Sequence, residues 1–286
     1  MTKLRISTSL NLHEGSRENI PEYITKGLSF HKKIGFDAVD MPSPLFKGMG
    51  EKWEEGIAHA LRESEKAGIR FELCHLPFGI KPDAPQEEQE AFRASVHTAI
   101  DAAKMLGVSY AVLHPNSVTI PMSEYDEKAQ HEMVMAHLSP FAEHAAKLGV
   151  KLVVENMPVV PGARVTHRFS QSAEEICQVA DAFGMGICWD FGHANVSGVH
   201  QSEAITYIGD RLKMVHVHDN CAMADEHNMP FTGNVDWQDA MHGLALVSFD
   251  GVFDLELSPA RFPAPLRKSH ARLALETAQY LMTYLK

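Results

Sequence analysis

Cysteine is scarce in this chain of 286 residues, and its four cysteines show no paired spacing. They are Cys74, Cys177, Cys188 and Cys221. A disulfide framework or a cysteine-rich zinc site needs cysteines at close, repeated spacings, so the sequence excludes both. We expect these residues to be small, buried and reduced thiols.

Long apolar runs are also missing. No stretch approaches the roughly 20 apolar residues that span a bilayer. The opening segment MTKLRISTSL alternates like a strand and has neither the apolar core nor the cleavage site of a signal peptide. The sequence therefore predicts a cytoplasmic protein with no membrane partner, and its 45% hydrophobic content is ordinary for a globular fold.

An excess of basic charge is absent too, because the formal net charge is -11. Proteins that bind a phosphate backbone gather Lys and Arg on one face, so this composition disfavours nucleic acid as a partner. No G-x-G-x-x-G fingerprint follows the first expected strand. Its absence disfavours a doubly wound dinucleotide-binding sheet, and we expect no organic cofactor.

Five amphipathic segments end in glycine and pass directly into an apolar run. A glycine just past the end of a helix takes the left-handed conformation that terminates it, and the β-branched run that follows is typical of a strand. These glycines thus mark helix-to-strand junctions. They are Gly35, Gly68, Gly107, Gly149 and Gly184.

The whole chain divides into eight strand-and-helix units. Strict alternation predicts a parallel sheet, and eight units predict an α/β fold of one domain over residues 1–286, a (β/α)₈ TIM barrel. An open doubly wound sheet is the structural alternative. Three Pro-rich pieces, MPSPLF, MPVVPGAR and SPARFPAPL, follow strands and are expected to be loops of the active face. The expected strands are 4–10, 38–41, 70–75, 110–114, 151–155, 186–190, 212–218 and 251–257. The expected helices are 19–34, 52–67, 87–106, 123–148, 172–183, 201–208, 236–246 and 266–285.

Metal-capable side chains close six of the expected strands. The carboxyl ends of barrel strands meet at one rim, so these side chains should converge there. A buried carboxylate is costly unless it is paired or binds a metal, which favours metal binding over a structural ion-pair network. The segments are LCHLP with His75, AVLHP with His114, LVVEN with Glu155, CWDFGH with Asp190 and His193, VHVHDN with His216 and His218, and LELS with Glu256.

The central set of this group is oxygen-rich. Glu155, Asp190, His216 and Glu256 offer three carboxylates and one imidazole, which suit one divalent ion, Mn²⁺, Mg²⁺ or Co²⁺, with Zn²⁺ also compatible. His218 shares a strand face with His216. Asp254 shares a face with Glu256, and we expect it beneath the metal as a hydrogen-bonding support.

These motifs carry a resemblance to a known family. VVEN, CWDFGH, VHVHDN, DEHNMPFTGNVDW and LELS resemble segments of the xylose isomerase-like TIM-barrel superfamily, also called the AP endonuclease 2 family. It includes sugar isomerases and epimerases, inosose dehydratases and endonuclease IV. The resemblance implies that Glu155, Asp190, His216 and Glu256 are the metal ligands. It also implies substrate-binding or additional metal-binding roles for His75, His114, His193, Asp225 and His227, which complete a set resembling that of endonuclease IV.

The resemblance implies a metal-dependent isomerase or epimerase of a sugar, polyol or keto-sugar derivative. Glu155 and Glu256 would remove and return a proton on opposite sides of the substrate, through a metal-bound enediolate. A lyase or dehydratase using the same enolate is one alternative. Arg261 would contact an anionic or hydroxyl group or form a surface salt bridge. No Gly-rich phosphate loop is present, which favours an unphosphorylated substrate, and a homo-oligomer is compatible with the sequence.

A second alternative is an endonuclease IV-like phosphodiesterase with three metals. It is disfavoured because the family's DNA-penetrating Asn-Pro-Arg loop has no counterpart in MPSPLFKGMG, where Lys47 is the one basic residue. A sugar-binding barrel without turnover is a third alternative, disfavoured because both Glu bases are present.

Overall fold

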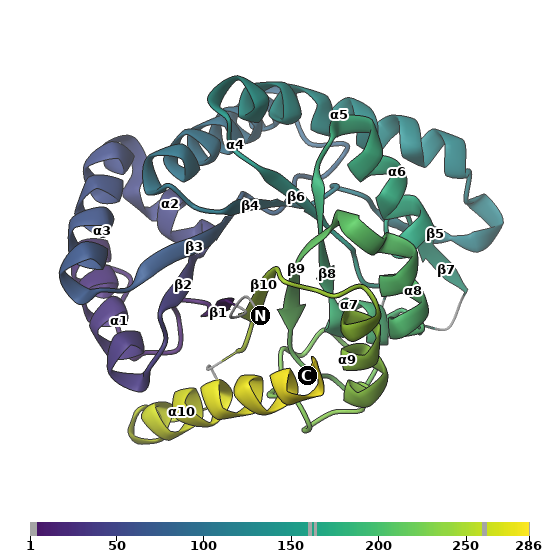
Figure 1. Ribbon diagram of the computed structural model, residues 1–286. Helices are drawn as coiled ribbons and strands as arrows, with labels where there is room; N and C mark the ends of the chain where they lie inside the picture. The colour runs from purple at the N-terminus through teal and green to yellow at the C-terminus, as the bar shows by residue number, and fades with distance from the viewer. Residues whose placement is uncertain (1–4, 160–161, 163–164, 259–261, 286) are drawn as a thin grey trace.

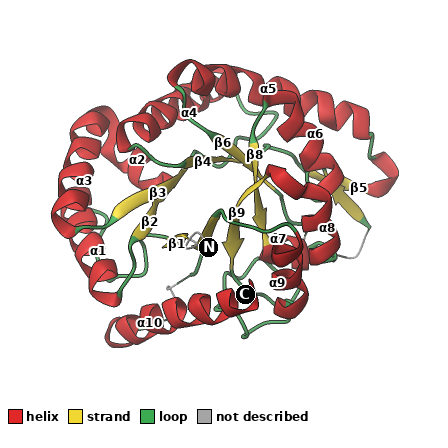
Figure 2. Ribbon diagram, viewed as in Figure 1, coloured by secondary structure: helices red, strands yellow, loops and turns green. Residues whose placement is uncertain are grey.

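The computed structural model describes residues 5–159, 162, 165–258 and 262–285. Eight parallel strands form a nearly closed barrel with helices around it, as a single TIM-barrel domain (Figures 1 and 2). This confirms the fold expected from the sequence. The barrel strands are β1 (Arg5–Thr8), β2 (Ala38–Met41), β3 (Arg70–His75), β4 (Tyr110–Leu113), β6 (Leu152–Glu155), β8 (Gly186–Asp190), β9 (Leu212–Val217) and β10 (Val252–Leu255). The helices are α1 (Ile20–Ile34), α2 (Ser43–Met49), α3 (Trp53–Ala67), α4 (Gln86–Leu106), α5 (Glu127–Leu148), α6 (Ala173–Phe183), α7 (Phe191–Val196), α8 (Gln201–Ile208), α9 (Trp237–Leu246) and α10 (Ala264–Leu281).

The strands pair in the order β1-β10-β9-β8-β6-β4-β3-β2. The seam between β1 and β2 is closed by a parallel bridge between Ser9 and Asp40, and the Leu10 N–H donates to the Asp40 carbonyl at 3.3 Å. A short stretch of pairing therefore joins β1 to β2 and leaves the barrel nearly closed at this seam.

The glycines expected to end helices do so. Gly35, Gly68, Gly107, Gly149 and Gly184 all have positive φ and cap α1, α3, α4, α5 and α6. Each gives the chain the left-handed turn that leads from a helix into the next strand.

The barrel interior is layered. Six apolar side chains, one from each of six neighbouring strands, pack together as a buried cluster on the barrel axis. A larger apolar cluster fills the space between the sheet and the helices. The axial layer matters for the site because the next inward-facing residue on each of these strands is polar. The layer consists of Leu73, Val112, Val153, Cys188, Met214 and Val252.

Three details differ from the sequence-based expectations. The segment MPSPLF is largely helical, because Pro44 stands in the first turn of α2, where its missing N–H costs nothing. Helix α5 begins at Glu127, where the Asp126 side chain accepts the Ala129 N–H, and the preceding Met122–Glu124 is a short 3-10 turn. Cys221 is exposed, whereas the other three cysteines are buried as expected.

Helix α7 and the two strands of a separate ribbon were not expected at all. β5 (Thr119–Pro121) and β7 (Thr166–Arg168) form an antiparallel ribbon separate from the barrel sheet. β5 follows the end of β4 and β7 follows the end of β6 in the chain. The ribbon therefore stands beside the ends of two strands that carry expected site residues.

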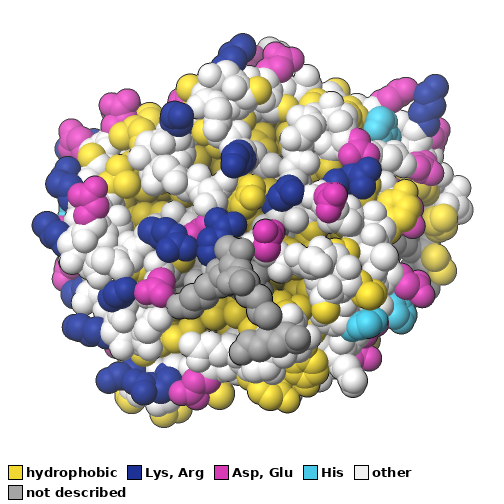
Figure 3. All heavy atoms as spheres, viewed as in Figure 1, with side chains coloured by type: hydrophobic (Ala, Val, Ile, Leu, Met, Phe, Trp, Pro, Cys, Tyr) yellow, Lys and Arg dark blue, Asp and Glu magenta, His cyan; other side chains and the backbone are white. Residues whose placement is uncertain are grey.

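Lysine side chains lie in the last turns of several helices, where they complement the helix dipole. Helices run antiparallel to barrel strands, so these lysines lie towards the amino-terminal ends of the strands. Figure 3 shows Lys and Arg side chains spread over the face turned to the viewer in Figure 1. Among the described residues, no helix is long and apolar enough to cross a membrane.

Candidate metal centre

A polar layer lies directly above the apolar axial layer. His75, His114, Glu155, Asp190 and His216 each follow an axial apolar residue by two positions, so all five point into the barrel. None of the five residues is more than 8% exposed. Burial of this many titratable groups in one place is costly unless they neutralise one another or bind ions.

The central feature of the layer is the Nδ1 atom of His216. Oε1 of Glu155 lies 3.1 Å from it, Oε2 of Glu256 lies 3.4 Å away and Oδ2 of Asp190 lies 3.8 Å away. Four donor atoms from four strand ends thus converge on one point, as expected for the central set.

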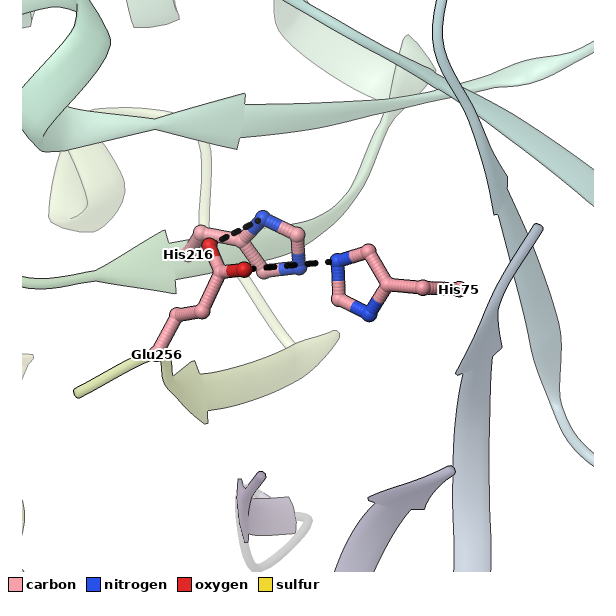
Figure 4. A group of neighbouring side chains, drawn as sticks. All are labelled: His75, His216 and Glu256. Atoms are coloured by element: carbon pink, nitrogen blue, oxygen red, sulfur yellow. Dashed lines mark ion pairs between the residues drawn. The ribbon is translucent and has the colours of Figure 1, made fainter. Parts of the chain in front are cut away.

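Both glutamates have a second oxygen beside another histidine. Oε2 of Glu155 lies 3.1 Å from Nε2 of His114, and Oε1 of Glu256 lies 3.7 Å from Nε2 of His75. Figure 4 shows the Glu256 carboxylate beside the His216 ring, with one ion pair to His216 and one to His75. The His75 ring stacks on that of His216 at 4.9 Å between centroids. Each glutamate therefore joins the central point to one further imidazole.

A second group of donors lies beside the first. Asp190 caps α7 by accepting the His193 N–H at 2.6 Å, and this turn directs the His193 side chain back over the barrel. Nε2 of His193 lies 3.2 Å from Oδ2 of Asp225, and Nε2 of His227 lies 3.1 Å from the same oxygen. The structure thus brings all nine expected site residues to one end of the barrel.

The histidines and carboxylates strongly shift one another's protonation. Burial alone would raise the pKa of Glu155, but the His216 and His114 rings hold it well below its usual range. The neighbouring imidazoles likewise bring the pKa of Glu256 to about 2, against the effect of burial. Burial lowers the pKa of His75 and His193, but nearby carboxylates raise them to about 9 and about 10. Carboxylate and imidazolium charges therefore lie side by side in this buried layer and stabilise one another.

Several supporting residues were not predicted. Asp40, at the barrel seam, places Oδ2 3.0 Å from Nδ1 of His75. The side-chain Oδ1 of Asn156 accepts the Asp190 N–H at 2.6 Å. The backbone carbonyl of Asn156 lies 2.7 Å from Nδ1 of His193. Asp40 ends the run AVD and Asn156 follows the run LVVE, so the strand-end pattern that indicated Glu155 and Asp190 could also have indicated them.

The loop that carries Asp225 and His227 is built around another unpredicted carboxylate, that of Asp219. This buried side chain accepts hydrogen bonds from the backbone N–H groups of Asn220, Phe231 and Val235 and from the Trp237 indole. His218 was expected to face inward and does, with Nε2 3.0 Å from Oδ2 of Asp190.

Asp254 and Arg261 were also singled out in the sequence. Asp254 is fully buried and pairs in register with His216, in the layer below Glu256. Burial raises its pKa to about 7, with the nearby Asp40 carboxylate adding to the effect. Arg261 lies outside the described residues.

Known proteins are similar in sequence to this chain over most of its length. An uncharacterised protein of Methanocaldococcus jannaschii is 27% identical over 241 residues, which are 83% of this chain and 80% of that protein. A protein of Streptomyces coelicolor that is provisionally named a hydroxypyruvate isomerase is 27% identical over 246 residues, which are 80% of this chain and 84% of that protein.

Solved structures share the fold at lower identity. A D-tagatose 3-epimerase-like protein has a TM-score of 0.73 and 21% identity, with 99% of this chain and 97% of that chain covered. The 3-keto-D-glucoside 4-epimerase of E. coli has a TM-score of 0.72 and 17% identity, with 97% and 100% covered. The model of the family described as xylose isomerase-like TIM barrel matches residues 28–281. The chain therefore belongs to the xylose isomerase-like TIM barrel family.

Proposed function

We propose that this protein is a divalent-metal-dependent isomerase or epimerase of a sugar, polyol or keto-sugar derivative. The observation that carries the proposal is the placing of Glu155 and Glu256. Each turns one oxygen towards Nδ1 of His216 and the other towards a separate histidine. Two carboxylates arranged in this way suit a reaction that removes a proton at one carbon and returns it.

The donor set fits a divalent ion. Three carboxylate oxygens surround one imidazole nitrogen, a combination that suits Mn²⁺, Mg²⁺, Co²⁺ or Zn²⁺. Glu155, Asp190, His216 and Glu256 would hold the ion. When bound there, it would polarise a substrate carbonyl and favour the negative charge that develops on its oxygen.

The two glutamates would move the proton. β6 and β10 are separated in the barrel by β8 and β9, so Glu155 and Glu256 approach a bound molecule from different sides. The low pKa of each keeps it as a carboxylate, the form that accepts a proton. General base catalysis of this kind contributes on the order of 10² to 10⁴ in rate. His193, Asp225 and His227 would bind substrate hydroxyl groups.

The names of relatives support this class of reaction. One relative is named for hydroxypyruvate isomerisation, and two similar structures are titled for epimerisation of sugars or a keto-glucoside. All three reactions move a proton next to a carbonyl group.

A second candidate is a phosphodiesterase with three metal ions. It is favoured by the grouping of donors, because His75, His114 and Glu155 form one potential ion site and His218, Asp225 and His227 form another beside the central set. The lysines that end the helices lie towards the opposite end of the barrel, away from these donors. This distribution makes a phosphate backbone the less suited substrate.

Two measurements separate the candidates. The metal content of the purified protein should be one ion per chain, and incubation with keto-sugars in D₂O should place deuterium next to the carbonyl without loss of a leaving group. Deuterium uptake with loss of water or an aglycone would indicate the lyase. Three tightly bound ions together with nicking of abasic duplex DNA would overturn the isomerase proposal.

Variants connect the exchange to the two glutamates. Glu155→Gln and Glu256→Gln should each reduce deuterium exchange by at least about 100-fold, because an amide cannot accept the proton. Glu90→Gln, on the exposed side of α4, is the matched control and should exchange like the unaltered protein. Normal exchange in either active-site variant would contradict the assignment.

A further inference from the structure

Arg168 is a half-buried arginine on the ribbon beside the metal centre. It is the last residue of β7, and it pairs in register with Thr119 of β5. Its guanidinium Nε donates to the carbonyl of Ser117 at 3.1 Å and lies 3.2 Å from the Ser117 hydroxyl. Its terminal amino groups have no hydrogen-bond partner, and no carboxylate forms an ion pair with it, within the described ranges.

The ribbon holds this arginine in place. Nε2 of His167, the neighbouring residue, lies 2.7 Å from Oε1 of Glu175 on α6, and the Tyr125 hydroxyl donates to the same oxygen. The Ser170 N–H donates to the other Glu175 oxygen at 3.0 Å. Residues on both sides of Arg168 are thus fixed to one buried carboxylate, so its guanidinium is presented by a rigid support.

This support lies next to the proposed catalytic end of the barrel. Ser117, which contacts Arg168, follows His114 by three residues, and Met157, which follows Glu155 by two, donates its N–H to the Ser170 carbonyl at 3.0 Å. Burial lowers the pKa of Arg168 to about 10, while the Glu155 carboxylate acts to raise it. Arg168 is therefore close enough to Glu155 for the two charges to interact.

A guanidinium with its terminal amino groups free is suited to a particular ligand. Those groups form a planar fork that matches the two oxygens of a carboxylate or phosphate, and a hydrogen bond between charged groups is stronger than one to a neutral hydroxyl. The half-buried guanidinium forms no ion pair with a carboxylate in the described part of the chain, because Glu155 acts on it without direct contact, and an oxyanion would supply that contact.

We propose that Arg168 binds an oxyanion of the substrate, a carboxylate or a phosphate remote from the reacting carbonyl. This inference rests on the proposed function and narrows it, because the isomerase or epimerase would then act on acidic sugar derivatives. Arg168 would contribute to choice of substrate, while Glu155 and Glu256 move the proton.

The test compares ketoses that differ only at C6. D-Fructose and D-tagatose, their C6 carboxylates D-fructuronate and D-tagaturonate, and their 6-phosphates would be titrated into the Mn²⁺-loaded full-length protein by calorimetry. Deuterium exchange would be followed separately. At least one charged ketose should bind about tenfold or more tightly than its neutral counterpart, as expected for one charge-assisted contact. The carboxylate and phosphate arms identify which oxyanion is preferred.

Variants then assign the preference to Arg168. Arg168→Gln should remove it by raising KM for the charged ketose, with a smaller change in kcat and no change for the neutral sugar. Arg168→Lys should keep part of it, since charge remains but the fork is lost. Arg272→Gln, on the exposed side of α10, is the control, and thermal melts would verify that each variant is folded.

Two results would overturn the inference. One is equal or weaker binding of every charged ketose, and the other is a preference that survives in Arg168→Gln. Arg168-dependent binding of a charged ketose without any deuterium exchange would instead support the oxyanion site and count against the isomerase proposal. Deuterium exchange of neutral ketoses alone would support the isomerase proposal and count against the oxyanion site.

Discussion

Nδ1 of His75 lies 3.0 Å from Oδ2 of Asp40, and the opposite ring nitrogen faces Glu256 Oε1 at 3.7 Å. The buried Asp40 carboxylate therefore fixes the orientation of the ring. Asp40→Asn should weaken the contact with His75. Removing a residue that orients a metal-site histidine typically costs about 10- to 100-fold in metal affinity or activity. We expect a decrease of that size in deuterium exchange.

The matched control for Asp40 is Asp101, whose Oδ1 lies 2.8 Å from Nε2 of His144 between two surface helices. Asp101→Asn removes a similar carboxylate–imidazole pair away from the site and should change exchange by less than about twofold. Equal effects of the two variants would mean that Asp40 acts on general stability alone.

Gly192 in α7 leaves room for a histidine. A Cβ there would overlap the His218 ring, whose Nε2 lies 3.0 Å from Asp190 Oδ2. Gly192→Ala should therefore lower the free energy of unfolding by about 1–3 kcal/mol and reduce metal affinity, because His218 and Asp190 must move. Chemical denaturation and metal titration would measure the two effects. Gly56→Ala in α3 would meet only the flexible Met49 side chain and should cost less than about 1 kcal/mol.

Metal binding should stabilise the folded protein. The clustered carboxylates of Glu155, Asp190 and Glu256 are brought together only by folding, so an ion that binds them favours the native state. At 100 times its Kd the ion adds about 2.7 kcal/mol to the free energy of unfolding. A chelator should lower the melting temperature of the metal-loaded protein, and the difference should shrink in Glu256→Gln. A melting temperature indifferent to chelator would count against the metal centre.

Acid should destabilise the fold through His31. This residue of α1 is fully buried, with Nδ1 2.7 Å from the Gly27 carbonyl, and burial lowers its pKa to about 4. The unfolded chain binds the proton near pH 6.5, whereas the folded chain binds it only near pH 4. Stability is therefore retained above pH 6.5 and is lost as the pH falls towards 4, by on the order of 3 kcal/mol.

Urea unfolding across this pH range would measure the effect. His31→Leu should flatten the pH dependence, whereas replacement of the exposed His242 by Leu should leave it unchanged. An identical pH dependence in the protein and in His31→Leu would show that other groups cause the acid sensitivity.

Most of the expected site residues came from a local signal, because they stand at or just after the ends of apolar runs, whereas Asp225 and His227 came from the family resemblance alone. Glu155 and Asp190 end apolar runs, and the parallel strands of a barrel place such ends on one rim. The helix-ending glycines marked five of the helix-to-strand junctions in the same way. Both signals lie within a few residues of the chain, and the barrel topology then brings the strand ends together at one rim.

The supporting residues are harder to predict because they depend on contacts between distant segments. Arg168 is 51 residues from Ser117, and its strand is too short to show periodicity. Asp219 accepts bonds from residues up to 18 positions away, which no local pattern announces. The loop expected in MPSPLF is helical because a proline at the start of a helix resembles a turn proline in sequence.

The β5–β7 ribbon forms a two-stranded sheet of its own, while the central donors belong to strands of the barrel sheet or directly follow them. Its residues can therefore change without disturbing the hydrogen bonds that hold the barrel together. If the proposed reaction centre is correct, variation in the ribbon would offer a short evolutionary route to new substrates, because the wall beside the centre could be rebuilt while the proposed catalytic residues stay in place.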